Sequence, residues 1–162
     1  MHAIVAVDEN WGIGCDNRLL FDIPEDMQYF KDYTLGKVVV MGYNTLLSLP
    51  KSNPLPNRTN IILCDDINFS RENAIVCNSI PELLEVSKNY NPDDVIIIGG
   101  AAVYKQMLPY CKTVLVTKVK ASKKSDKFFP NLDLLPNWIV KSVSEEKTHG
   151  DLKFNFFVYE QM

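Results

Sequence analysis

Cysteine and histidine are scarce in this chain of 162 residues, which has four cysteines and two histidines. The cysteines lie far apart and form no C-x-x-C pair, so the usual ligand pattern of a zinc site is missing and we expect no metal site. Reduced thiols in a cytoplasmic protein fit this pattern best. The four residues are Cys15, Cys64, Cys77 and Cys111.

Long hydrophobic runs are absent as well, and no apolar stretch is long enough to cross a bilayer. The chain opens directly on "HAIVAV" without a basic leader, which predicts a cytoplasmic protein with no membrane partner. No long exposed apolar helix is evident either, so we expect a monomer.

Charge of one sign does not dominate, because the net charge is −3 and acids and bases are interspersed. The one basic cluster, "KVKASKKSDK" at 118–127, lacks the interleaved aromatics of a nucleic-acid surface. It is expected to cover a loop, and no nucleic-acid partner is expected.

The length and the alternation of short β-branched runs with helix-period segments predict one α/β domain over residues 1–162. Its central sheet is expected to be mixed but mostly parallel, with flanking helices. The expected strands are Ala3–Val7, Lys37–Met41, Thr59–Leu63, Ala74–Cys77, Val95–Ile98 and Thr113–Val119. The expected helices are Glu25–Thr34, Asn44–Leu49, Ile80–Asn89 and Ala101–Pro109.

The last part of the chain has a different pattern. "NWIVKSVSEEK" and "LKFNFFVYEQ" read as two long strands on either side of "THGD". Two strands around a tight turn form an antiparallel hairpin, so the sheet is expected to end in one.

The segment "LLFDIPEDMQYFK" begins with three carboxylates at a predicted helix start, where Asp22 or Glu25 can cap free N–H groups. On a helical wheel Asp26 falls inside the arc of apolar side chains, between Tyr29 and Phe30, whereas Glu25 faces water. A carboxylate among aromatics is paired, neutral with a raised pKa, or placed to bind a ligand. The alternative is an ordinary first-turn aspartate bonded to backbone N–H groups.

Glycines mark two predicted strand-to-helix junctions, "VVVMGYNT" and "VIIIGGAAVYKQM". A helix start offers free N–H groups to a phosphate, and glycine allows close approach. One junction alone is weak evidence, but two on parallel strands predict a diphosphate site at the carboxyl edge of the sheet. "GIGCDN" does not match G-x-G-x-x-G, and no Walker lysine follows a glycine run.

Seven motifs together resemble the bacterial type of dihydrofolate reductase in order and spacing over nearly the whole chain: "VAVDENWGIGCDN", "IPEDMQYFK", "VVVMGYNT", "LPNRTNIIL", "IIIGGAAVYKQMLP", "VTKV" and "FFP". The resemblance implies an oxidoreductase of tetrahydrofolate biosynthesis and one-carbon metabolism. It would transfer hydride from NADPH or NADH to dihydrofolate, and it would bind antifolates.

The resemblance also assigns roles to residues. Asp26 matches the buried acid that binds the pterin ring and is held to promote protonation of N5, and Thr117 matches the threonine that steadies it. Arg58 matches the arginine that pairs with the α-carboxylate of the substrate, a role that suits its planar fork. The expected catalytic residues are Asp26, Thr117 and Phe21. The substrate-binding residues expected by resemblance are Ile4, Val5, Asp26, Met27, Phe30, Leu49, Leu55, Arg58, Ile98, Tyr104 and Thr117.

For the cofactor, the resemblance implies a segment beside the nicotinamide carboxamide and a diphosphate cradle at the two glycine junctions. The residues so implied are Ala6, Ile13, Gly14, Leu19, Gly42, Tyr43, Asn44, Thr45, Leu63, Cys64, Asp65, Ile98, Gly99, Gly100, Ala101, Ala102, Val103 and Tyr104.

The chain departs from the family at the mobile loop, where Leu20-Phe21 replaces Pro-Trp. Phenylalanine has no indole N–H to hold water beside the acid, so we expect slower catalysis or a different loop closure.

A second departure concerns the grip on the 2′-phosphate of NADPH, where basic and polar residues are replaced by Tyr43, Asn44 and "LCDD". Losing a charge-assisted hydrogen bond costs about 1.5–3 kcal/mol. An acid at this place can instead accept the ribose 2′-hydroxyl, as in NAD-selective sites. We therefore expect relaxed or NADH-leaning cofactor use, with Asp65 as the reader. The alternative is that Asp65 and Asp66 only begin a turn and a base from elsewhere meets the phosphate.

Two other functions remain open from the sequence. One is reduction of another heterocycle, as by the pyrimidine reductases of riboflavin synthesis, although a ribityl phosphate would call for a phosphate site in place of Arg58. The other is a pterin- or nucleotide-binding protein with weak turnover. Asp26, Thr117 and Arg58 together favour the folate enzyme.

Overall fold

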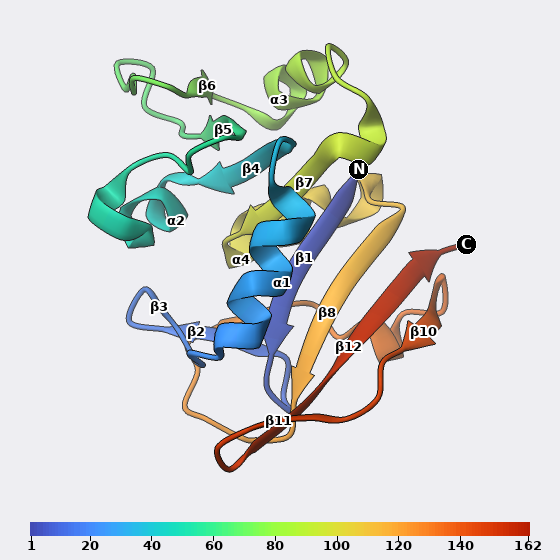
Figure 1. Cartoon of the computed structure of the whole chain (residues 1–162). Coiled ribbons are helices and arrows are strands. Elements are labelled where there is room, and N and C mark those ends of the chain that lie inside the picture. Colours follow the sequence, from blue (N-terminus) through green and yellow to red (C-terminus); the bar gives the residue numbers. More distant parts are fainter.

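The computed structural model describes all 162 residues, and one mixed sheet of nine strands organises it (Figure 1). The strand order is β10-β12-β8-β1-β7-β4-β5-β6, and β11 pairs with β12 beside this path. All pairs from β8 to β6 are parallel, whereas β12 runs antiparallel to its neighbours. A separate antiparallel sheet has the order β3-β2-β9.

The strands are β1 His2–Val7, β2 Gly12–Cys15, β3 Arg18–Leu19, β4 Val38–Gly42, β5 Thr59–Leu63, β6 Ile75–Cys77, β7 Val95–Gly99, β8 Thr113–Val119, β9 Lys127–Phe128, β10 Trp138–Val143, β11 Lys147–His149 and β12 Leu152–Gln161. The α-helices are α1 Pro24–Thr34, α2 Tyr43–Ser48, α3 Ile80–Ser87 and α4 Ala101–Met107. Short 3-10 turns are η1 Pro50–Ser52, η2 Pro92–Asp94, η3 Leu108–Tyr110 and η4 Leu132–Leu134. None of the helices combines the length and apolarity needed to span a membrane.

The predicted strands and helices are confirmed, with differences only at their ends. Three expectations were wrong or incomplete. The first strand of the closing hairpin is broken between β10 and β11. The Ser144 amide still donates to the Phe156 carbonyl, but the Ser144 hydroxyl replaces its carbonyl as the acceptor of the Phe156 amide, so the backbone ladder stops there. The small sheet was not predicted. Neither Asp22 nor Glu25 caps α1, since Ile23 holds the N-cap position without a side-chain hydrogen bond.

The central strands are buried on both faces, as parallel strands usually are. On β4, Val38 and Val40 join the largest hydrophobic cluster, whereas Val39 and Met41 face the opposite side. α1 covers this opposite face in front of β1 and β8 (Figure 1). Tyr29 of α1 stacks on Phe156 of β12, with ring centroids 4.1 Å apart and planes inclined by 12°. The first half of α1 is therefore fixed to the sheet by an aromatic pair.

The loop 120–126 presses closely on β2 at Gly12. A Cβ at Gly12 would lie 2.2 Å from Ser125 Oγ and 3.0 Å from Asp8 Oδ1. Glycine is thus required here by close approach of the two segments, since real Cβ contacts are longer.

This contact predicts that Gly12→Ala lowers the free energy of unfolding by about 1–3 kcal/mol, the usual cost of overpacking. Adding Ser125→Gly removes the clashing side chain and should restore most of the loss, while Ser125→Gly alone should change stability little. Urea unfolding of the four chains measures the coupling. Equal stability of Gly12→Ala and wild type would contradict the close packing.

Candidate active site

Strands β1 and β7 separate after their first residues, which leaves a gap at the carboxyl half of the sheet. β1 pairs with β7 only at His2 and Ala3, whereas it pairs with β8 along its full length. Tyr104, buried on α4, reaches this gap and donates its hydroxyl to the Ile4 carbonyl over 2.7 Å. Burial raises the pKa of this phenol, so it remains a donor. The carbonyl retains a second lone pair for a ligand.

Asp26 faces the sheet from the first turn of α1, as the helical wheel predicts. Thr117 on β8 is 1% exposed, and its hydroxyl donates to Asp26 Oδ1 over 2.6 Å. Burial raises the pKa of Asp26 above its ordinary value of 3.8, and the hydrogen bond from Thr117 acts in the opposite direction. The alternative of a carboxylate bonded to free backbone N–H groups does not occur. Its neighbour Glu25 turns outward and pairs with Lys147 at 3.0 Å.

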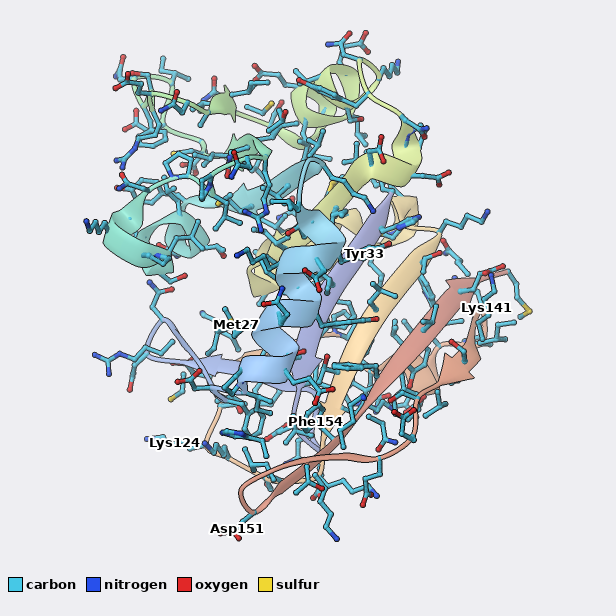
Figure 2. The ribbon with its side chains drawn as sticks, viewed as in Figure 1. Met27, Tyr33, Lys124, Lys141, Asp151 and Phe154 are labelled. Atoms are coloured by element: carbon cyan, nitrogen blue, oxygen red, sulfur yellow. The ribbon has the colours of Figure 1, made fainter.

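Three of the apolar side chains predicted as walls pack against the two small clusters on the α1 face of the sheet. Phe30 packs against the buried Ile4 cluster. Leu49 and Leu55, which follow α2, pack against a second cluster formed by β4, β5 and α2. Met27 is 48% exposed, and Figure 2 shows it projecting from α1 on the side of β2 and β3. The Met27 side chain is thus not buried in the core and is available to contact a ligand.

Arg58 lies at the other end of α1. Its Nε donates to Thr34 Oγ1 over 2.8 Å and its Nη1 donates to the Pro56 carbonyl over 2.7 Å. Partial burial lowers the pKa of this guanidinium, which nevertheless remains charged. Five to eight residues separate Asp26 from the helix end that holds Arg58, or about 8–12 Å at 1.5 Å per residue. The helix thus sets an anionic and a cationic group at a fixed spacing.

The two glycine junctions lie side by side, because β4 and β7 are parallel neighbours and Met41 is in register with Gly99. A Cβ at Gly42 would lie 3.1 Å from Val103 Cγ2. Gly99 has a φ of 129°, which a side chain would strain, and its peptide bond to Gly100 is cis. Added Cβ atoms at Gly99 and Gly100 would each lie 3.4 Å from Thr45 Oγ1. Bare backbone therefore faces this edge, as a diphosphate requires.

The residues expected near the adenosine end follow β4 and β5, whose last residues Gly42 and Leu63 are paired. Tyr43 is 40% exposed and meets Phe69 edge to face, with ring centroids 5.1 Å apart. Asp66 Oδ1 accepts from the Asn68 amide over 2.9 Å and begins a turn, but the exposed Asp65 side chain makes no hydrogen bond or ion pair. The contribution of Phe69 was not foreseen, since it is far from Tyr43 in sequence.

The segment expected beside the nicotinamide is held by the small sheet. Ile13 is buried, Gly14 pairs with Leu19, and Leu19 is 72% exposed. Phe21 packs against the buried cluster of Ile23, Val119 and Phe154. The remaining residues predicted to bind the cofactor lie on the central sheet and on the helices that follow its strands. They are Ala6 on β1, Asn44 and Thr45 on α2, Leu63 and Cys64 at the end of β5, Ile98 on β7, and Ala101 and Ala102 on α4.

Two loop residues near this segment were missed by sequence reasoning. Lys123 donates from its Nζ to the Leu20 carbonyl over 2.8 Å and lies 4.8 Å from the centre of the Phe21 ring. Asp8 is buried at the end of β1. The sequence signal for Asp8 was a single aspartate directly after an apolar strand. Lys123 could not be distinguished from the other lysines of the basic cluster at 118–127.

The raised pKa of Asp26 predicts a linked change in stability. The folded state disfavours the ionised form, so its penalty is present above the folded pKa and absent below the unfolded one near 3.8. Asp26→Asn should therefore raise the melting temperature at pH 7, and the gain should vanish at pH 3. Thermal unfolding across this range measures it, with Asp22→Asn at an exposed site as the control. A variant less stable than wild type at pH 7 would contradict the penalty.

Comparisons with known proteins agree with this geometry. A family model described as dihydrofolate reductase matches residues 1–161. A dihydrofolate reductase of Bacillus subtilis is 34% identical over 162 residues, covering 98% of this chain and 92% of that protein. One of Neisseria meningitidis serogroup A is 38% identical over 130 residues, covering 80% and 78%.

Among solved structures, dihydrofolate reductase from Enterococcus faecalis, complexed with NADP(H) and RAB-propyl, superposes with a TM-score of 0.88. The two sequences are 28% identical, and the match covers 99% of this chain and 95% of that one. Sequence and fold therefore agree over essentially the whole length. The chain belongs to the dihydrofolate reductase family, the enzymes that reduce dihydrofolate with a nicotinamide nucleotide.

Proposed function

We propose that this chain reduces 7,8-dihydrofolate to 5,6,7,8-tetrahydrofolate at the gap between β1 and β7, with Asp26 as the group that binds the pterin. The observation that carries the proposal is the placement of Asp26 and Arg58 at opposite ends of α1. Dihydrofolate has donors on its pyrimidine edge and carboxylates on its glutamate tail. The two ends of the helix offer the complementary charges.

Asp26 supports the reaction through the pyrimidine edge of the substrate. Its carboxylate can accept from N3–H and the 2-amino group, while the Thr117 hydroxyl bonded to Oδ1 keeps it oriented. A bound nicotinamide nucleotide supplies hydride to C6, and this creates demand for a proton at N5. By fixing the tautomer of the ring, Asp26 favours protonation at N5. Burial raises the pKa of this carboxyl above its ordinary value, and the hydrogen bond from Thr117 acts against that rise.

Arg58 would bind the α-carboxylate of the substrate tail. Thr34 and the Pro56 carbonyl hold its guanidinium through Nε and Nη1, so the fork is oriented before a ligand arrives. Between the two ends, Met27, Phe30 and Leu49 supply apolar surface for the pterin and benzoyl rings. The same surface suits antifolates of similar shape.

The nicotinamide nucleotide fits the cradle of Gly42, Gly99 and Gly100, where side chains would fill the space close to Thr45 and Val103. Thr45 can donate to a phosphate oxygen from its hydroxyl. Ile13 and Gly14 would lie beside the carboxamide. We do not assign a metal to this site.

Cofactor choice is proposed to lean toward NADH or to be relaxed. Tyr43 occupies a position where binding of a 2′-phosphate would call for a basic side chain. Its ring instead packs edge to face against Phe69. Asp65 follows the neighbouring strand β5; its side chain is exposed and makes no hydrogen bond or ion pair, whereas Asp66 accepts from the Asn68 amide in a turn. A carboxylate within about 4 Å of a phosphate costs about 4 kcal/mol at an effective dielectric of 20. The same carboxylate can accept a ribose 2′-hydroxyl.

The test of activity is the loss of absorbance near 340 nm with dihydrofolate, using NADPH and NADH in parallel. We expect oxidation of the cofactor to fall by about a hundredfold or more in Asp26→Asn, the usual scale of proton-transfer assistance. Oxidation that is unchanged in this variant would sink the role of Asp26. No oxidation by wild type, together with tight antifolate binding, would indicate a binding protein instead.

The role of Asp65 predicts a shift in cofactor ratio. Asp65→Asn removes the charge without changing the shape, so the kcat/KM for NADPH should rise about tenfold relative to that for NADH, or about 1.4 kcal/mol. Asp66→Asn is the matched control, because an asparagine oxygen can still begin the turn. An equal shift in both variants would mean a general charge effect, and a strong NADPH preference of wild type would refute NADH-leaning use.

A further inference from the structure

Asp8 is a buried carboxylate outside the proposed catalytic set, at the point where β1 ends. It is 2% exposed, and three backbone N–H groups donate to it. Oδ1 accepts from Asn10 over 2.9 Å and from Gly12 over 2.8 Å, while Oδ2 accepts from Lys123 over 3.0 Å. One oxygen therefore orders the turn into β2, and the other joins that turn to the loop 120–126.

The loop 120–126 also contacts the far end of the segment 12–21, which begins with β2. The Lys123 side chain donates to the Leu20 carbonyl over 2.8 Å and covers the Phe21 ring. Between these two points the Asp126 amide donates to the Gly14 carbonyl over 3.0 Å. The loop 120–126 is thus attached to the middle and the end of the segment 12–21 directly, and to its beginning through Asp8, whose bond from the Lys123 amide is partly buried.

We propose that Asp8 is a positioning residue that fixes β2, and with it Ile13 and Gly14, beside the nicotinamide; this role rests on the proposed function. Hydride transfer is sensitive to position, because a displacement of about 1 Å can cost about a hundredfold in rate. Asp8 is buried and acts through the three backbone amides that donate to it. Asp26 on α1 and Arg58 at the start of β5 are held by other contacts, so the substrate site does not depend on it.

Asp8→Asn separates the two functions of the carboxylate. An asparagine oxygen can still accept from Asn10 and Gly12, but its NH2 group would face the Lys123 amide. The hydrogen bond between Asp8 and Lys123 is therefore lost, while the local turn and the other contacts between the two segments remain. Glu9→Gln is the matched control: it removes one charge in the same turn, and its side chain is exposed and makes no hydrogen bond or ion pair.

The experiment compares wild type, Asp8→Asn and Glu9→Gln by steady-state kinetics and single-turnover hydride transfer with NADPH. For Asp8→Asn we expect the hydride-transfer rate to fall about tenfold or more and the KM for NADPH to rise, while the KM for dihydrofolate stays within about twofold. Glu9→Gln should match wild type. Two results would overturn the positioning role: kinetics of Asp8→Asn that equal those of wild type, or an equal rise in the KM for NADPH and the KM for dihydrofolate.

Amide hydrogen exchange of unliganded wild type provides a second readout that does not depend on activity or on a variant folding. The Lys123 amide should exchange at least about tenfold more slowly than that of its neighbour Lys124, which has no such carboxylate partner. Equal exchange of the two amides would overturn the proposal even if the chain reduces dihydrofolate. Slow exchange at Lys123 in a chain without reductase activity would instead keep the link and reject the proposed function.

Discussion

The hydrogen bond between Thr117 and Asp26 is the constraint on which the site depends, because it joins the helix that carries the acid to the centre of the sheet. Burial makes this carboxylate unfavourable, as its raised pKa shows. Packing elsewhere on α1 must therefore hold it in place. Tyr29 stacks on Phe156, and Ile23 is buried at the start of the helix. Stability contributed by the apolar face of α1 offsets the cost of its one inward-facing acid.

The sheet contributes the opening into which this acid points. β1 remains paired with β8 throughout, but it leaves β7 after Ala3, so Thr117 stays beside Ala6 while the other side of β1 is open. The same divergence places the glycine junctions of β4 and β7 next to the gap. The surfaces proposed for substrate and cofactor thus lie next to each other because one pair of parallel strands separates within a single sheet.

Periodic features of this fold could be predicted from the sequence, and backbone-mediated features could not. The period of 3.6 residues places Asp26 inward, and runs of β-branched residues identify the parallel strands. β2 has two glycines among its four residues and β3 has only two residues, so neither carries such a signal. The break at Ser144 depends on side-chain and amide bonds to Phe156, a partner distant in sequence. The three backbone amides that donate to Asp8 could not be predicted either, because nearly every residue type has a backbone N–H and the sequence does not show which ones will meet the carboxylate.

The departures from the family pattern lie where they disturb the fold least. Asp26 and Thr117 are hydrogen-bonded to each other between α1 and β8, so replacing either changes a bond that joins the helix to the sheet. Tyr43 and Asp65 sit at exposed strand ends. Phe21 keeps an aromatic ring but has no indole N–H, and it packs against Phe154 in a small cluster. Substitutions at these exposed or half-buried positions should therefore change the free energy of unfolding little. The proposed changes in cofactor preference and loop closure can then occur independently of the acid proposed to bind the pterin.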